Sequence, residues 1–212
     1  MAYVFSFAYR VVVFNMCGTY NNQDATKNPL PGFTFVYSFV GLIAVLRAAG
    51  SGPVRVCFTP INDVGKVVLV KDEYGKLVRK KITLISLFHD CCELVMQYKN
   101  LVFAIDEIWH VHPGAAPAQL PEVQKTLFMQ WRHFGITPMW AAQMPQLVNS
   151  AVRSVSTETY VGKFTDKLDV DAVARCKVKD PQAIAYLGQL EPFNFIHQYE
   201  NGEWRIERAP AR

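Results

Sequence analysis

The sequence lacks the features that mark disordered proteins and strongly basic proteins. Charged residues make up only 19% of the 212 residues, half of the residues are apolar, and no long block of one charge sign occurs. This composition excludes a disordered chain and suffices for one sizeable core, so we expect a single domain over residues 1–212. The formal net charge of +4 permits contact with a polyanion without requiring one. The densest basic run, Arg79-Lys80-Lys81, is interpreted as the solvated end of a hairpin.

The sequence also lacks a regular cysteine framework, a signal peptide and an apolar run long enough to span a membrane. An odd number of cysteines without regular spacing indicates reduced thiols in a cytosol-like compartment; they are Cys17, Cys57, Cys91, Cys92 and Cys176. The N-terminus is apolar but is broken by Arg10, which makes it a poor signal sequence. The longest apolar run, Phe33 to Leu46, is shorter than the roughly 20 residues of a spanning helix. We interpret it as a buried helix of a cytoplasmic protein, and the alternative is a segment seated in a membrane.

Two common kinds of enzyme site are missing as well. The nucleophile elbow G-x-S-x-G of serine hydrolases does not occur, and Gly50-Ser51-Gly52 has the wrong spacing for it. Histidines, cysteines and acidic residues gather between His89 and His112, but no zinc-type spacing links them. A nucleophilic serine and a structural zinc ion are therefore both disfavoured.

Apolar strand patterns alternate with helical patterns along the chain, which is typical of an α/β sheet. The predicted strands are Arg10–Phe14, Val54–Phe58, Leu101–Ile105, Pro138–Ala142 and Glu158–Phe164. The predicted helices are Phe33–Ala49, Thr83–Tyr98, Glu122–Phe134, Asp169–Cys176 and Pro181–Leu187. Hairpins are expected across Gly75 and, at the C-terminal end, between Phe193–Tyr199 and Trp204–Glu207. No internal repeat and no linker interrupts this order.

The residues with the clearest chemistry are Asp106 and Glu107. They follow the fully apolar strand Leu101–Ile105, at the strand end where open α/β sheets bind ligands. In nucleotide hydrolysis, a carboxylate at this place holds Mg²⁺ and a second one polarises the attacking water as a general base. The alternative is that the acidic pair only caps the turn that follows the strand.

The sequence around this pair resembles the FtsK–HerA superfamily of P-loop ATPases that pump DNA. "LVFAIDEIWHVHP" is similar to the Walker B strand of that superfamily, and "WRHFGITPMWAAQMPQLVNSAVRSVSTETYVGKFTDKLD" is similar to the part after it. Viral genome-packaging ATPases and the Zot-like assembly ATPases of filamentous phages have the most similar arrangement. "RVVVFN" resembles the strand after their first helix, which usually ends in Asp where this chain has Asn15. The resemblance covers Arg10 to about Pro192, with specific motifs between Leu101 and Asp169.

The resemblance implies roles for particular residues. Asp106 would hold the Mg²⁺ of Mg–ATP, Glu107 would be the catalytic base, and Gln143 would be the polar sensor between γ-phosphate and water. Arg153 is the candidate arginine finger that reaches a neighbouring subunit's nucleotide, and Arg132 competes for that role. The expected fold is a RecA-like, mostly parallel sheet with helices on both faces. The expected partners are single- or double-stranded DNA, other copies of the chain in a ring, and a capsid or membrane-associated assembly partner; a viral protein would lie in the host cytoplasm or with the virion.

One part of the family pattern is missing from these residues, namely the P-loop G-x-x-x-x-G-K-[ST] that wraps the phosphates. The Gly-Lys pairs at 65–66, 75–76 and 162–163 are followed by Val67, Leu77 and Phe164, never by Ser or Thr. Only Met1 to Tyr9 precede the strand at Arg10, so the first strand and its loop have no room. We expect a gap or repacking in the sheet, and very weak binding of Mg–ATP. The chain is either a truncated product of a motor gene or a degenerate relative.

A non-catalytic role is the main alternative within the same fold. Such a chain would bind DNA or an assembly partner without hydrolysing ATP. Its mild basicity and four lysines late in the chain suit this role equally well; they are Lys163, Lys167, Lys177 and Lys179.

Overall fold

The computed structural model describes residues 9–16, 30, 32–112, 116, 119–176 and 178–209. Its contacts divide the chain into two compact units. Unit 1 comprises Met1–Val111 with Pro121–Ala141, and unit 2 comprises His112–Leu120 with Ala142–Arg212. The single domain expected from the sequence stays a prediction.

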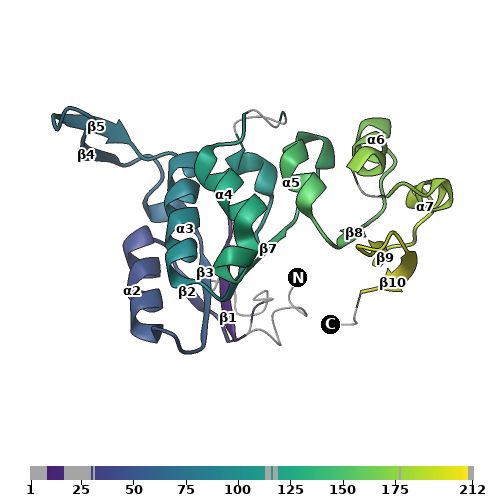
Figure 1. Ribbon diagram of the computed structural model, residues 1–212, viewed down its shortest axis with the longest axis horizontal. Helices are drawn as coiled ribbons and strands as arrows, with labels where there is room; N and C mark the ends of the chain where they lie inside the picture. Colours follow the sequence, from purple (N-terminus) through teal and green to yellow (C-terminus); the bar gives the residue numbers. More distant parts are fainter. Residues whose placement is uncertain are drawn as a thin grey trace. The chain divides into compact units, whose positions relative to one another are not determined.

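Unit 1 is built on a five-stranded sheet in the order β2-β3-β1-β6-β7, with every neighbouring pair parallel (Figure 1). The strands are β1 (Arg10–Phe14), β2 (Thr34–Val36), β3 (Val54–Phe58), β6 (Leu101–Ile105) and β7 (Ile136–Trp140). Helices α2 (Phe39–Ala49), α3 (Leu84–Tyr98) and α4 (Glu122–Gln130) flank it. The predicted α/β class with a parallel sheet is therefore confirmed. The five strands pair without a break, so the expected gap does not lie between them, and Pro138 belongs to an edge strand, where a missing amide is tolerated.

The core of unit 1 joins the sheet to α3 through aromatic side chains. The ring of Phe14 lies 5.6 Å from that of Phe58 and 5.2 Å from that of Phe88, both in edge-to-face geometry. Phe88 also stacks on Phe103 at 6.0 Å. The apolar side chains of α3 recur at helical spacing, so one face of the helix is buried against these rings. The other face of the sheet packs a second cluster of buried residues: Val11, Val13, Leu30, Cys57 and Ala104.

The predicted helix Phe33–Ala49 is wrong at its start. The residues Thr34–Val36 form the edge strand β2, and the helix begins at Phe39, where the Ser38 Oγ accepts a hydrogen bond from the Gly41 amide at 3.2 Å. β-Branched and aromatic residues followed by a serine N-cap favour this division. The helix is also not fully buried, because only Leu42 and Leu46 are inaccessible and Val40 is 76% exposed. Among the described residues, no helix has the length and apolarity needed to span a bilayer.

Other element boundaries differ from the sequence prediction by a few residues. Strand β7 begins at Ile136, two residues before the predicted start. The helix predicted over Glu122–Phe134 is α-helical only to Gln130 and continues as the 3₁₀ turn η4 (Trp131–Phe134). Further 3₁₀ turns are η1 (Pro60–Asn62), η2 (Ile108–Val111) and η5 (Pro145–Leu147).

Gly135 ends η4 in the left-handed conformation, with φ of 62°. A Cβ there would overlap the Asn100 side chain and lie 3.1 Å from its Cγ. We expect Gly135→Ala to lower the free energy of unfolding by about 2 kcal/mol, from backbone strain and from displacement of Asn100. Gly75→Ala is the control, because Gly75 also has a positive φ, 77°, and no neighbour within 4 Å of a Cβ. Urea unfolding should show about 1 kcal/mol for the control, and equal losses would contradict the role of Asn100.

Unit 2 combines short helices with a three-stranded antiparallel sheet in the order β10-β9-β8. Its elements are α5 (Ser150–Val155), β8 (Thr159–Val161), α6 (Lys167–Cys176), α7 (Pro181–Leu187), β9 (Asn194–Gln198) and β10 (Trp204–Arg208). The predicted C-terminal hairpin is confirmed as β9 and β10. The strand predicted over Glu158–Phe164 is shorter, and α6 begins two residues before the predicted Asp169. A buried cluster that includes Val161, Val178 and Ile196 holds these elements together.

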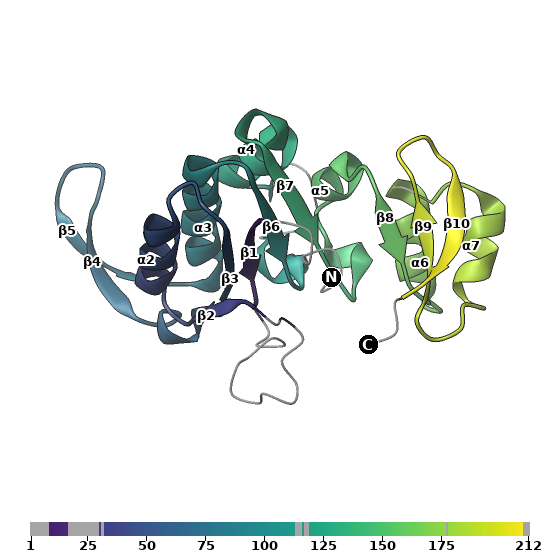
Figure 2. The same ribbon diagram turned by 90° about the horizontal axis from the view of Figure 1, so that it is seen from below.

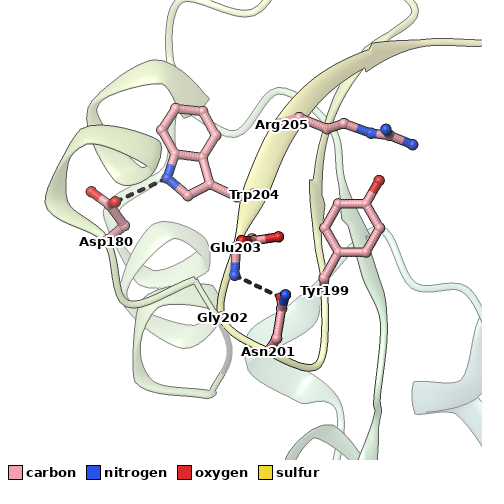
Figure 3. Close-up of a pocket in the computed structure, with 7 residues that line it drawn as sticks. All are labelled: Asp180, Tyr199, Asn201, Gly202, Glu203, Trp204 and Arg205. Carbon is pink, nitrogen blue, oxygen red and sulfur yellow. Dashed lines mark hydrogen bonds between the residues drawn. The ribbon is translucent and has the colours of Figure 1, made fainter.

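Polar contacts fix the β9–β10 hairpin against the start of α7. The Trp204 indole N–H donates to the Asp180 carboxylate at 2.9 Å, and the Glu203 amide donates to Asn201 Oδ1 at 3.0 Å (Figure 3). A shallow pocket is lined by these residues together with Tyr199, Gly202 and Arg205. Since Asp180 also accepts from the Gln182 amide as the N-cap of α7, its carboxylate serves the local fold.

Candidate functional site

Three neighbouring strands of unit 1 end in buried polar residues. Thr59 follows β3, Asn15 follows β1 and Asp106 follows β6, and their exposed fractions are 2%, 0% and 7%. Phe14 is in register with both Phe58 and Ile105, so the next residues continue the same row. The row therefore lies at the carboxyl edge of the parallel sheet, where the sequence placed Asp106.

The topology points to the same edge. After β1 the chain continues to β2, on one side of β1, whereas after β6 it continues to β7 on the other side. Connections that leave two adjacent strands in opposite directions mark the switch point, beside which open α/β sheets bind ligands. Asn15 and Asp106 follow the two strands at this point.

Backbone hydrogen bonds extend the sheet by one residue through this row. The Asn15 amide donates to the Phe58 carbonyl at 2.9 Å, and the Asp106 amide donates to the Phe14 carbonyl at 3.0 Å. The side-chain amide of Asn15 donates to Thr59 Oγ1 at 2.9 Å. The polar side chains are thus held by rigid strands rather than by a loop.

The Cys57 thiol lies near Thr59, Asn15 and Asp106. Burial raises the pKa of Cys57 to about 12; hydrogen bonds with Thr59 and Asn15 oppose this rise and the charge of Asp106 adds to it. The thiol consequently stays protonated at neutral pH, which excludes it as a nucleophile. Cys57 lies within β3 and belongs to the buried apolar cluster described above.

Glu107 adopts a left-handed backbone conformation, with φ of 52°, that side-chain-bearing residues rarely occupy. It is 8% exposed, and its Oε2 accepts a hydrogen bond from the Trp109 indole at 2.8 Å. The segment is fixed on both sides, because the Ala141 amide donates to the Ile105 carbonyl and the Ile108 amide donates to the Ala141 carbonyl, each at 3.0 Å. Such a conformation costs about 1–3 kcal/mol and is concentrated at functional sites.

The donor atoms of the row suit a hard divalent cation. Carboxylate, amide and hydroxyl oxygens are the ligands of Mg²⁺, which is typically held by one or two carboxylates with water and substrate phosphates. Asp106 would hold the ion, and Asn15 and Thr59 are the neighbouring oxygen-bearing side chains. Within the described ranges, no three His, Cys, Asp or Glu side chains form a closed metal site.

Arg132 is not brought to this edge of the sheet. It precedes β7, whose first residue, Ile136, pairs with Leu101 at the amino end of β6. Because the five residues of β6 span roughly 17 Å, Arg132 and Asp106 belong to opposite edges of unit 1. The Arg132 side chain is exposed and lies over the Trp131 ring at 5.0 Å. Its predicted role as a finger toward another subunit stays a prediction.

Gln143 and Arg153 belong to unit 2. Gln143 follows Ala141 by two residues and is exposed, and its role as a sensor stays a prediction. Arg153 lies on α5, and its Nη1 donates to the backbone carbonyls of Pro145 and Val148, the second at 2.8 Å. Its guanidinium therefore supports the η5 turn of its own unit in this structure.

Sequence reasoning missed Thr59. The signal was available, since Thr59 is the first polar residue after the apolar strand Val54–Phe58, just as Asn15 and Asp106 follow their strands. What the sequence does not reveal is that β1 lies between β3 and β6 and so puts all three residues in one row.

The chain was compared with known proteins. No protein-family model matches it, and no curated protein matches it in sequence. Solved structures do match. The genome packaging NTPase B204 from Sulfolobus turreted icosahedral virus 2, in complex with ATP-gammaS, has a TM-score of 0.62 and 11% identity, over 98% of this chain and 85% of that chain.

The fold is that of a viral genome-packaging NTPase. B204 from Sulfolobus turreted icosahedral virus, described as a DNA-packaging ATPase, has a TM-score of 0.61 and 11% identity, over 96% of this chain and 83% of that chain. The N-terminal domain of zonular occludens toxin from Neisseria meningitidis also matches, at 15% identity over 72% of this chain and 76% of that chain, with a TM-score of only 0.35. At these identities the B204 likeness establishes the fold alone.

Proposed function

We propose that the chain is the carboxylate-bearing part of an ATP-driven DNA translocase of the FtsK–HerA type, most similar to a viral packaging motor. One observation carries the proposal: buried Asp106 stands at the carboxyl edge of a parallel sheet, at the switch point of its topology and beside Asn15 and Thr59. The fold shared with B204, a DNA-packaging ATPase, supports it.

In this proposal each residue has a distinct task. Mg²⁺, when bound, neutralises the phosphate oxygens of ATP. Asp106 holds the ion, while Asn15 and Thr59 position that carboxylate through the polar row. Glu107 accepts a proton from the attacking water, and the Trp109 indole orients its carboxylate. Gln143 is proposed as the sensor, and an arginine from a neighbouring subunit as the finger that stabilises transition-state charge.

Residues 1–212 alone lack one sequence motif that ATP binding by this fold needs. The P-loop sequence is needed to wrap the phosphates, and no match to it occurs among residues 1–212. We therefore propose that this polypeptide by itself binds Mg–ATP very weakly and hydrolyses it little. As proposed partners, DNA would be the moved substrate, further copies would form the ring that completes each site, and a capsid or membrane-associated assembly would receive the DNA.

ATP hydrolysis with and without duplex DNA tests the function. The measurement uses the 212-residue chain and a form that also contains any coding sequence found upstream of it. DNA-stimulated hydrolysis by the longer form supports the motor. Salt-sensitive DNA binding without hydrolysis by either form would instead favour the second candidate, a non-catalytic DNA- or partner-binding protein with the same fold.

A further inference from the structure

Unit 1 carries a two-stranded hairpin that pairs with no other described strand. It consists of β4 (Val67–Lys71) and β5 (Leu77–Lys81), and both views show it extending away from the sheet and from α2 and α3 (Figures 1 and 2). Val67, Leu69 and Leu77 are each about 60% exposed. An isolated two-stranded hairpin gains little stability from its own packing. Stability of the fold therefore does not explain why these apolar side chains are exposed.

The hairpin holds the whole net charge of the chain. Residues 66–81 contain six cationic and two acidic side chains, a net charge of +4, which equals the formal net charge of all 212 residues. The remaining residues therefore sum to zero. The six cations are Lys66, Lys71, Lys76, Arg79, Lys80 and Lys81.

Most of this positive charge is available at the surface. Lys66 forms an ion pair with Asp63 at 3.3 Å, but the other five cations have no carboxylate within ion-pair distance among the described residues. Of the two acids, Asp72 is used in the turn, where its Oδ1 accepts from the amides of Tyr74 and Lys76 at 3.0 and 2.8 Å. Burial raises the pKa of Asp90 on α3 and the charge of Lys80 opposes this rise, so Lys80 has an acidic neighbour beyond ion-pair distance. The cations still outnumber the acids within the hairpin.

Cations and apolar side chains alternate across the hairpin instead of separating. Four of its five cross-strand pairs join an apolar residue to a cation, and only Val70↔Val78 is apolar on both sides. The mixed pairs are Val67↔Lys81, Val68↔Lys80, Leu69↔Arg79 and Lys71↔Leu77. Because paired residues share a face and faces alternate along a strand, the two faces of the hairpin differ. One face has a cation in each of its three pairs and so is positively charged along its whole length: Val67↔Lys81, Leu69↔Arg79 and Lys71↔Leu77. The opposite face has Val68, Val70 and Val78 with the single cation Lys80.

The hairpin is also held in shape at both ends. At the tip, Gly75 adopts a φ of 77° and its amide donates to the Asp72 carbonyl at 2.9 Å. At the base, the Gly65 amide donates to the Ile82 carbonyl at 2.9 Å and the Ile82 amide donates to the Lys66 carbonyl at 2.8 Å. A preformed ribbon loses little conformational entropy when it binds.

We propose that the β4–β5 hairpin is the DNA-contacting arm of this protein and binds the phosphate backbone of duplex DNA. A two-stranded ribbon fits the major groove of B-DNA, and lysine and arginine side chains bind phosphates with release of counterions. The choice of DNA as the polyanion rests on the proposed function, whereas the location of the contact rests on the charge and shape of the hairpin.

The test compares two triple variants with the same change in charge. Arg79→Gln, Lys80→Gln and Lys81→Gln remove three hairpin cations, and Lys163→Gln, Lys167→Gln and Lys179→Gln remove three from unit 2. Binding of a short blunt duplex is measured by fluorescence anisotropy over a range of salt concentrations, without nucleotide. Circular dichroism and gel filtration verify the fold and the oligomeric state of each variant.

The hairpin variant is expected to lose at least about tenfold in affinity at low salt, and its log–log salt slope should fall by about 3, since each phosphate contact contributes about 0.9. The unit 2 variant should stay close to wild type. Equal losses in both variants, or none in the hairpin variant, would overturn the proposal. Two further outcomes would overturn it. One is hairpin-dependent binding to phosphatidylglycerol vesicles by a chain that does not bind DNA. The other is loss of self-association in the hairpin variant.

This experiment also separates the hairpin from the proposed function. If no form of the chain binds or hydrolyses Mg–ATP while the hairpin variant still loses DNA binding, the motor proposal fails and the DNA-contacting arm stands. If the longer form hydrolyses ATP but the two triple variants bind DNA alike, the arm is refuted and the motor proposal remains.

Discussion

Replacing Glu107 with Gln will lower the rate of ATP hydrolysis by at least about 100-fold in a form of the chain that hydrolyses ATP. The amide keeps the shape of the side chain and an oxygen for the Trp109 indole, which now donates to the carboxylate at 2.8 Å. It cannot accept a proton from water. Because Glu107 is held at a φ of 52° by bonds on both sides of the segment, the substitution should leave the fold and the affinity for Mg–ATP almost unchanged.

The measurement is steady-state hydrolysis at saturating Mg–ATP, with nucleotide affinity determined separately. Glu122→Gln serves as the matched control, since Glu122 is 85% exposed on α4 and forms an ion pair with Lys125 at the surface. Its rate should equal that of the wild type. A Glu107→Gln protein with normal kcat would show that Glu107 caps the turn and takes no part in proton transfer.

Replacing Arg132 with Ala will lower hydrolysis by about 10³-fold or more without loss of stability, if a finger acts between subunits. We propose Arg132 over Arg153 for this role because Arg132 is exposed at the amino edge of the sheet, with the Trp131 ring beneath it. Arg153 instead donates to the carbonyls of Pro145 and Val148. We expect Arg153→Ala to lower the free energy of unfolding by about 2 kcal/mol, because two carbonyls lose a charged donor.

Rings assembled from two different variant subunits distinguish whether Arg132 or Arg153 is the finger. A ring that combines Arg132→Ala subunits with Glu107→Gln subunits should recover part of the activity, since some interfaces then contain both intact groups. The reverse pattern, in which Arg153→Ala abolishes hydrolysis at unchanged stability while Arg132→Ala does not, would assign the finger to Arg153.

Much of the sheet follows from local sequence. Arg10–Phe14, Val54–Phe58 and Leu101–Ile105 are β-branched, apolar runs of strand length, and the structure has the same bounds for them. The start of α2 was missed because Phe33–Leu46 is one continuous apolar run. Only Ser38 and the β-branched residues before it mark the division, and the edge position of β2 beside β3 comes from tertiary pairing. The shift of β7 to Ile136 has the same origin, since register with β6 decides where an edge strand begins.

The site was predictable only in part. Asp106 and Glu107 stand out because acidic residues end an apolar strand, and the structure puts both at the carboxyl edge with little exposure. Thr59 was not found, because strand order cannot be read from periodicity. The left-handed backbone at Glu107 could not be predicted either, because no local pattern marks it. The flanking residues Ile105 and Ile108 are both hydrogen-bonded to Ala141, and these tertiary bonds fix the segment.

Titration calorimetry of Mg–ATP measures whether Asp106 holds the metal of the bound nucleotide and whether residues 1–212 alone can bind its phosphates. Three samples are needed: the chain itself, a form extended by any upstream coding sequence, and the extended form with Asp106→Asn. We expect no measurable binding by the chain, Mg²⁺-dependent binding by the extended form, and loss of the Mg²⁺ dependence in the variant. Tight binding by the chain alone, or unchanged Mg²⁺ dependence in the variant, would contradict this expectation.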